Sequence, residues 1–272
     1  MIFTFTFEVR PDRDVLVPPF TSKLSRTIFL DFSPTYSKHV EAEVYKPFRV
    51  TVVKEGNRPI YSRGKGFVTL KGEKVYNFAV STLLQEVVEE VIPKASLTKE
   101  LFNAKFRVEM ANVEIRNELG VEDSRLYKMY FNTPTLLQPP RPKFRKKENR
   151  FLLFPYVPSI FYSLSSHWNR FMSEKIVGVT GSKTLYYFRE VDYELNPVST
   201  FYGSTPTRGF VGWVLFELRA RRNSKLRADL RKLLDYANYF GLGKSRSIGF
   251  GEVKLMISRE NTDGSHDKRA GY

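Results

Sequence analysis

The order of strand-like and helix-like stretches constrains the fold of this chain most. Phe3, Phe5, Phe7 and Val9 alternate with other residues, as in a half-buried β-strand. The stretches that follow are a helix at 21–32, a strand at 46–53, a strand pair at 64–70 and 74–80 around a turn at 71–72, a helix from about 81, and a strand at 102–115. This order matches a ferredoxin-like βαββαβ unit with one surplus strand, which we interpret as part of an added hairpin. Residues 35–44 have no clear period.

The second half repeats this order without repeating the sequence. The expected elements are a strand at 125–132, a helix at 156–172, strands at 185–191 and 210–218, a helix at 225–240 and a strand at 252–258. We therefore predict an α+β protein with two tandem ferredoxin-like (βαββαβ) units and antiparallel sheets. The expected domains are 1–122 and 123–260, followed by a disordered tail at 261–272.

A glycine-rich stretch, GLGKSRSIGFG, joins the last expected helix to the last strand. Its glycines are Gly241, Gly243, Gly249 and Gly251. Glycine lets the backbone approach a ligand closely and present its amides. Lys244, Ser245 and Arg246 lie between the two glycine pairs and suit a phosphate. One glycine would be enough to end a helix, so four glycines and two cations favour binding to a phosphate backbone.

The charge of the chain favours a polyanionic partner. Lys and Arg number 44 against 29 Asp and Glu, which gives a formal net charge of +15. No apolar run is long enough to span a membrane, and no basic helix has a fully apolar face. We therefore expect nucleic acid as partner and no membrane. Aromatic residues make up 15% of the chain and include candidates for base stacking.

The chain has no cysteine, which excludes disulfides and thiolate metal sites. Its three histidines, His39, His167 and His266, are far apart in the sequence. We therefore expect no metal and no cofactor. The first residues alternate like a strand and do not resemble a signal peptide, so we expect a cytoplasmic protein.

Candidate catalytic groups are cations. Lys23 and Arg26 are three residues apart and share a helix face, Lys46 opens the next strand, and Arg208 lies in an expected turn before an apolar strand. His39 is the one histidine in this region, with packing as the alternative role. The other reading of each cation is a solvated surface residue.

Such a set suits cleavage of RNA by its own 2′-hydroxyl. The protein has to align the attack, neutralise the pentavalent phosphorus and manage protons. Cations serve the second task. DNA lacks the 2′-hydroxyl and is not cut in this way.

The glycine-rich stretch resembles the signature of the RAMP superfamily, in particular the CRISPR-associated endoribonucleases that process precursor crRNA. That signature has two Gly-hydrophobic-Gly units separated by a short basic run, here Gly241-Leu242-Gly243 and Gly249-Phe250-Gly251. VPPFTSKLSRTIF is similar to the first helix of the family, YKPFRVTVV to its second strand and RGFVGWVLFEL to its penultimate strand.

The resemblance implies a metal-independent endoribonuclease that cuts within CRISPR repeats and leaves a 2′,3′-cyclic phosphate and a 5′-hydroxyl. Many members use a histidine near the end of the first helix, and His39 lies near that place. The SKLSR and YKP patterns resemble an archaeal subgroup that relies on Lys and Arg. We therefore assign catalysis to Lys23, Arg26 and Lys46, with Arg208 as phosphate stabiliser and His39 as second choice. The glycine-rich stretch would bind RNA through its backbone, Lys244, Ser245 and Arg246.

Two alternatives remain open at this point. One is a noncatalytic RAMP subunit that holds crRNA in an effector complex, which does not need the cations of the first helix. The other is a general single-strand binder. The expected partner is CRISPR repeat RNA, single-stranded or weakly structured, and subunits of an effector complex are a further candidate. The proline-led edge strand is compatible with a homodimer.

Overall fold

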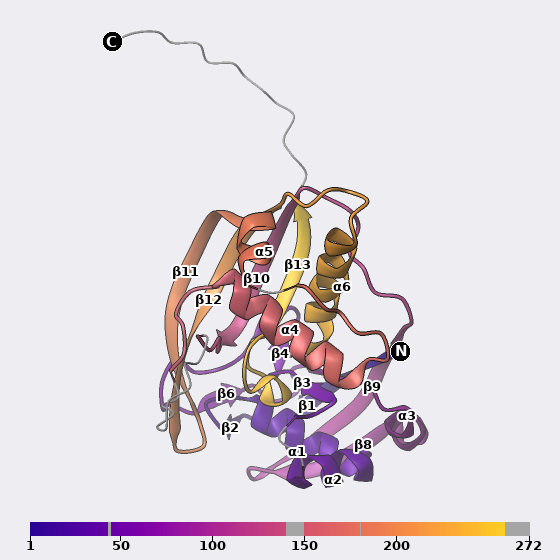
Figure 1. The fold of residues 1–272 in the computed structure, drawn as a ribbon. Coiled ribbons are helices and arrows are strands. Elements are labelled where there is room, and N and C mark those ends of the chain that lie inside the picture. The colour runs from indigo at the N-terminus through magenta and orange to yellow at the C-terminus, as the bar shows by residue number, and fades with distance from the viewer. Residues whose placement is uncertain (43–44, 140–149, 180, 259–272) are drawn as a thin grey trace, which may run out of the picture.

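A computed structural model gives the fold of residues 1–42, 45–139, 150–179 and 181–258 (Figure 1). It contains two α+β units, one above the other in the view of Figure 1, with the β11–β12 hairpin of the upper unit reaching down beside the lower one. The expectation of two ferredoxin-like units with antiparallel sheets is confirmed. The predicted tail at 261–272, and His266 within it, lie outside the described residues.

The N-terminal unit has a seven-stranded sheet around β1 (Ile2–Pro11), with β7 (Tyr76–Thr82) and β9 (Ala104–Arg116) as its neighbours. Phe5 lies opposite Val80 on one side and Val113 on the other. The remaining strands of the sheet are β3 (Phe48–Val50), β4 (Lys54–Glu55), β5 (Arg58–Pro59) and β8 (Ser96–Leu101). The order β3-β7-β1-β9 within this sheet is that of a ferredoxin-like unit.

Helices of the N-terminal unit pack on one face of this sheet. They are α1 (Ser22–Phe32), α2 (Pro34–Ala42) and α3 (Gln85–Val91), with a short 3₁₀ helix at Ile92–Lys94. Leu24, Ile28 and Phe32 of α1 share a core with the alternating phenylalanines of β1. The 3.6-residue period of α1 and the two-residue period of β1 thus bury one set of apolar side chains together.

Two details of this unit differ from the sequence-based expectation. The predicted strand pair around 71–72 is wrong, because β6 (Val68–Leu70) pairs with β2 (Val15–Val17) in a separate small sheet. The surplus hairpin is instead β8–β9, where Phe102 and Asn103 form the turn with positive φ. A two-residue turn of this kind matches the twist of its strands. The stretch 35–44, which has no clear period in the sequence, belongs to α2 as far as Ala42.

The C-terminal unit has four strands in the order β11-β12-β10-β13. Their bounds are β10 (Leu126–Thr135), β11 (Phe188–Tyr202), β12 (Thr205–Leu218) and β13 (Val253–Ser258). Helices α4 (Val157–Phe171), α5 (Ser182–Tyr187) and α6 (Lys225–Phe240) lie over one face of the sheet (Figure 1). The predicted strand at 185–191 is wrong in its first part, because α5 continues to Tyr187 before β11 begins.

The β11–β12 hairpin brings the two units together. It runs beyond the rest of its sheet towards the N-terminal unit (Figure 1), where the Thr200 hydroxyl donates to the Ser62 carbonyl at 2.8 Å. A small core of Phe20, Val52, Leu136 and Phe250 lies between the units. Phe20 and Phe250 are stacked with 4.2 Å between ring centroids. The contact therefore orders α1 against the glycine-rich stretch.

Candidate active site

A small pocket lies where α1 meets the tip of the β11–β12 hairpin. Its volume is about 160 Å³, and its lining residues are Lys23, Arg26, Thr27, Leu30, Tyr36 and Tyr202. We call it the helix pocket. Lys23 and Arg26 lie on one face of α1, as their spacing predicts, and Tyr202 comes from the other unit. The pocket therefore exists only when the two units are joined.

Arg26 is held in this pocket by phenol groups. Its Nε donates to the Tyr36 hydroxyl at 3.3 Å, and its Nη1 donates to the Tyr202 hydroxyl. Burial lowers the pKa of Arg26, but the two neighbouring phenols outweigh it, so the net shift of the pKa is upward. No carboxylate among the described residues pairs with Arg26. Its positive charge is thus fixed in position and left for an anion.

Lys46 lies close to the helix pocket without lining it. Its Nζ donates to the Val40 carbonyl. Burial, and then the charge of Arg26, lower its pKa from the usual lysine value. An ammonium with a lowered pKa gives up its proton more easily, which is a property of a general acid.

His39 is not part of the pocket lining. It lies on α2, half-buried, with its ring 5.6 Å from that of Phe48. The His39 ring thus packs against Phe48 of β3. It lies on the same helix as the pocket residue Tyr36, three residues further along the chain.

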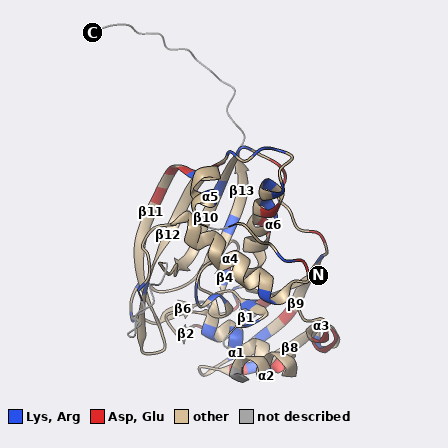
Figure 2. Cartoon of the chain, in the orientation of Figure 1, with Lys and Arg blue, Asp and Glu red and all other residues tan. Residues whose placement is uncertain are grey.

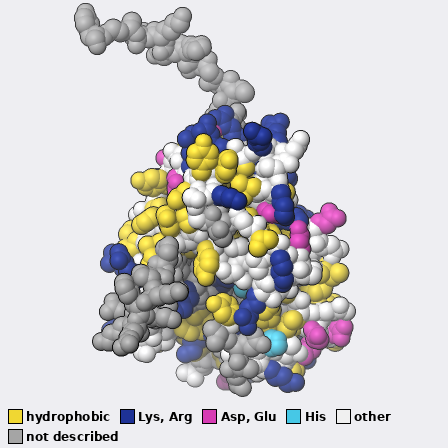
Figure 3. Space-filling view, in the orientation of Figure 1, with side chains coloured by type: hydrophobic (Ala, Val, Ile, Leu, Met, Phe, Trp, Pro, Cys, Tyr) yellow, Lys and Arg dark blue, Asp and Glu magenta, His cyan; other side chains and the backbone are white. Residues whose placement is uncertain are grey.

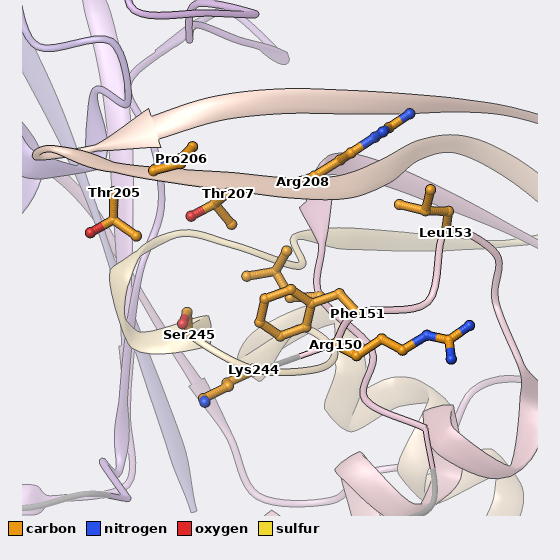
Figure 4. Close-up of a pocket in the computed structure, with 10 residues that line it drawn as sticks. Arg150, Phe151, Leu153, Thr205, Pro206, Thr207, Arg208, Lys244 and Ser245 are labelled. Carbon is orange, nitrogen blue, oxygen red and sulfur yellow. The ribbon is translucent and has the colours of Figure 1, made fainter. Parts of the chain in front are cut away.

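A second, larger pocket lies between the start of β12 and the glycine-rich stretch (Figure 4). Its volume is about 670 Å³, and its lining residues are Leu136, Arg150, Phe151, Leu153, Thr205, Pro206, Thr207, Arg208, Lys244 and Ser245. We call it the loop pocket. None of these residues is acidic, whereas three are cations. The ring of Phe151 packs against the core between the units and is part of the pocket wall.

Arg208 belongs to the loop pocket. The expectation that it lies in a turn is wrong, because it is a strand residue of β12 paired with Ser199. The lining of the helix pocket does not include it. The turn is formed by the two residues between Tyr202 and Thr205. Strand β12 therefore begins several residues before its first apolar run, and the sequence places the turn too late.

The glycines of the glycine-rich stretch make room for the chain itself. All four have positive φ, and a Cβ on Gly251 would lie 1.9 Å from the Leu242 carbonyl oxygen. A Cβ on Gly243 would lie 2.6 Å from the Leu136 carbonyl oxygen, and one on Gly249 would lie 2.8 Å from Ser22 Cβ on α1. Any side chain here would displace backbone or separate the units.

Most amides of this stretch already have partners within the protein. The amides of Gly241, Leu242, Gly243, Lys244, Ile248, Gly249 and Gly251 donate to other protein groups. This changes the expected reason for the glycines, which was to present amides to a phosphate. The Ser22 hydroxyl donates to the Ile248 carbonyl at 2.6 Å and ties the stretch to the start of α1. RNA contacts by the glycines stay a prediction.

The two cations of the stretch lie in different surroundings. Lys244 is exposed and lines the loop pocket with Ser245. Arg246 is half-buried and its Nη1 donates to the Gly241 carbonyl at 3.4 Å. Burial lowers the pKa of Arg246 to about 10, and the nearby charge of Arg49 acts in the same direction. Arg246 is therefore directed into the interface of the units, while Lys244 faces the pocket.

Buried polar groups also join the units, and the sequence gives little sign of them. Arg49, 3% exposed, donates to the Asn238 and Tyr239 carbonyls at 3.0 and 3.1 Å. His167 Nδ1 lies 2.6 Å from the Tyr236 hydroxyl, and its Nε2 lies 3.1 Å from the Lys46 carbonyl. Burial, and then the charge of Arg246, hold the pKa of His167 well below its usual value, so the ring is neutral. It fixes the backbone that carries Lys46.

Sequence reasoning missed Tyr36, Tyr202, Arg150 and Phe151 as site residues. Tyr202 is 176 positions from Arg26, its hydrogen-bond partner. Neither tyrosine has a spacing that distinguishes it from a packing residue. Arg150 ends a charge run whose other members, 144–149, lie outside the described residues.

Neither a cluster of metal-ligating side chains nor a membrane-spanning helix occurs among the described residues. No three or more His, Cys, Asp or Glu residues there lie together as a metal ion would need. In the described part of the chain, every helix is too short or too polar to cross a bilayer.

Comparison with known proteins gave matches along both units. The family model described as Cas6 N-terminal domain matches residues 3–116, and the one described as CRISPR-associated endoribonuclease Cas6 matches residues 129–253. Two curated relatives from Saccharolobus solfataricus are CRISPR-associated endoribonuclease Cas6 1 and Cas6 2. The first is 26% identical, over 96% of this chain and 98% of the relative, and the second is 24% identical, over 95% and 97%.

Solved structures support the same fold. A Cas6 product complex has a TM-score of 0.66 at 18% identity, covering 94% of this chain and 100% of that one. Thermus thermophilus Cas6 has a TM-score of 0.63 at 15% identity, covering 94% of this chain and 98% of that one.

Proposed function

Because the chain belongs to the family of CRISPR-associated Cas6 endoribonucleases, we propose that it cuts precursor CRISPR RNA within its repeats. The relatives are named as endoribonucleases, and a solved structure of similar fold is a product complex. The bond would break at the helix pocket. The observation that carries this assignment is Arg26, held by two phenols with no described carboxylate to neutralise it.

The reaction would use the RNA's own 2′-hydroxyl. This hydroxyl gives its proton to solvent water and attacks the adjacent phosphorus, the bond from phosphorus to the 5′ oxygen breaks, and that oxygen takes up a proton. The products are a 2′,3′-cyclic phosphate and a 5′-hydroxyl. Charge builds up on the phosphate oxygens in the transition state, where fixed donors act most strongly.

Each cation would have its own task in this reaction. Arg26 would neutralise the phosphate oxygens as charge develops, and Lys23 on the same helix face would hold the phosphate. Lys46, with its lowered pKa, would donate the proton to the leaving 5′ oxygen. His39 stays the second choice for proton transfer. The lining of the helix pocket offers cations and hydroxyls instead of carboxylates or imidazoles, which supports chemistry without a metal.

The loop pocket would bind RNA next to the cut. Arg150, Arg208 and Lys244 would contact phosphates, and the Ser245 hydroxyl would add a hydrogen bond. The glycine-rich stretch lies between the pockets, with Lys244 at one and its Ile248 carbonyl bonded to Ser22 near the other. It would therefore position one pocket relative to the other.

An assay with two repeat RNAs tests this proposal. The protein is incubated in EDTA with all-ribose repeat RNA and with the same RNA carrying a 2′-deoxy residue at the cut. We expect cleavage of the first RNA to a cyclic phosphate, and binding without cleavage of the second. Binding without cleavage of the all-ribose RNA would instead indicate a noncatalytic subunit, and cleavage of the deoxy RNA would contradict the 2′-hydroxyl mechanism.

A further inference from the structure

An arginine cluster lies at the end of the C-terminal sheet that is remote from both pockets. Glu217, 3% exposed, is at its centre, on the side of the sheet away from the buried Val214 and Phe216. Arg125 Nε lies 2.8 Å from one carboxylate oxygen and Arg189 Nη2 lies 2.7 Å from the other. Arg219 Nε lies 3.7 Å away. The three guanidiniums come from the starts of β10 and β11 and the end of β12.

Positive charge continues beyond the contacts that Glu217 makes. Arg189 Nη2 contacts the carboxylate at 2.7 Å, whereas Arg219 Nε lies 3.7 Å from it, beyond hydrogen-bond distance. Arg221 and Arg222 follow in the next turn, both exposed, and no described carboxylate pairs with either. Figure 3 shows Lys and Arg side chains gathered at this end of the molecule, and Figure 2 shows the same loops in blue. An excess of fixed cations in one place is a binding surface for an anion.

The guanidiniums are also accessible and oriented. The side chains of Arg125, Arg189 and Arg219 are 60%, 50% and 52% exposed, while Glu217 holds them from beneath. Arginine presents a planar set of donors that matches phosphate oxygens, and a guanidinium already held in place loses less entropy on binding.

An exposed aromatic residue adjoins the cluster. The Arg219 amide donates to the Tyr187 carbonyl at 2.7 Å, and the ring of the neighbouring Tyr186 is 74% exposed. Cations interleaved with exposed aromatic rings are typical of surfaces that bind single-stranded nucleic acid. An acidic protein partner has no bases to stack on such a ring, so the ring favours a nucleic acid as the partner.

The position of the cluster indicates which part of the RNA it would meet. Strand β12 runs from Thr205 in the loop pocket to Leu218 beside the cluster, and a strand of this length spans about 40 Å. We propose that the arginine cluster binds the phosphate backbone of the precursor RNA outside the segment held at the two pockets. This inference rests on the proposed function for the identity of the RNA.

Binding assays with a short and a long RNA test the inference. The double variant Arg189→Ala/Arg219→Ala keeps Arg125 to pair with Glu217, and thermal melting checks its fold. Affinity is measured across salt concentrations for the repeat alone and for the repeat extended by its flanks. With the extended RNA we expect the affinity of the variant to fall about tenfold and its salt slope to drop by about 1.4. With the repeat alone we expect no change in affinity or cleavage.

Two further variants serve as controls. Lys71→Ala/Lys74→Ala removes two exposed cations from the N-terminal unit and should leave both affinities within about twofold of the wild type. Arg189→Lys/Arg219→Lys keeps the charge and should restore most of the salt slope. Unchanged binding of the extended RNA by the alanine variant would overturn the inference and leave the surface to an acidic protein partner. Failure of the wild type to bind and cleave the repeat alone would overturn the proposed function instead.

Discussion

The helix pocket and the loop pocket have similar charge but differ in how their cations are held. Arg26 in the helix pocket is half-buried and bonded to two phenols from different elements. Arg150, Arg208 and Lys244 in the loop pocket are exposed around a cavity of about 670 Å³. A charge fixed before the substrate arrives can stabilise a transition state, whereas exposed cations on long side chains mainly add affinity. The difference assigns chemistry to one pocket and binding to the other.

Arg26→Ala should have the largest effect on this division. The variant removes the fixed charge, so we expect the single-turnover cleavage rate to fall about 100-fold to 1,000-fold, with affinity for repeat RNA changing less than about fivefold. Arg26→Lys is the matched control. It keeps the charge but not the planar donors for Tyr36 and Tyr202, and should recover only part of the rate. Equal losses of rate and affinity in the alanine variant would break the division.

Lys46→Ala tests the proton transfer assigned beside the helix pocket. We expect a rate about 100-fold lower with normal RNA, because the leaving 5′ oxygen needs a proton. In a repeat RNA with sulfur in place of that oxygen, the 5′ sulfur leaves without protonation. The Lys46→Ala variant should therefore cut this RNA at nearly the wild-type rate.

Two results would contradict the assignment of Lys46. The first is a Lys46→Ala variant that stays slow on the sulfur-containing RNA. The second is a His39→Ala variant that alone abolishes cleavage, which would move proton transfer to the second-choice residue.

Arg208→Ala should act on binding. We expect affinity to fall about fivefold to tenfold and the salt slope to fall by about 0.7, while the rate at saturating protein stays within about threefold. Lys71→Ala removes an exposed cation outside both pockets and should change neither quantity. A rate loss at saturation as large as that of Arg26→Ala would return Arg208 to the catalytic set in which the sequence placed it.

His167 should have the smallest and most specific effect. Its pKa is lowered in the folded protein, so below about pH 6.5 the unfolded chain binds a proton that the folded chain does not. Stability should therefore fall as pH decreases, by up to about 1.4 kcal/mol per pH unit from this group. In His167→Gln, thermal melting between about pH 6.5 and pH 5 should lose this part of the slope. An unchanged slope would show that other groups control it.

The fold was largely predictable because its core follows simple periods. The alternation of Phe3, Phe5 and Phe7 and the leucine spacing of α6 place the same residues in the core that the structure buries. Strands without an apolar alternation were harder. The exposed β8, and the start of β12 at Thr205, carry no such signal, and the partner of β6 is a distant strand.

The site was predictable only in its helical part. Lys23 and Arg26 share a face because of local geometry, which the sequence contains. Tyr202 and Arg208 depend on how the β11–β12 hairpin meets the N-terminal unit, and Gly249 depends on its contact with Ser22 across the same interface. These contacts join residues far apart in the chain, and one sequence does not specify them.

Cross-linking from the cut site tests most directly where the bond breaks. Repeat RNA is made uncleavable by a 2′-deoxy residue and carries a photoreactive base at the cut, and the cross-linked peptide is identified by mass spectrometry. We expect cross-links to α1 or to the hairpin tip around Tyr202, which border the helix pocket. Cross-links confined to Phe151 or Lys244 would place the cut in the loop pocket and contradict the assignment of chemistry to Arg26 and Lys23.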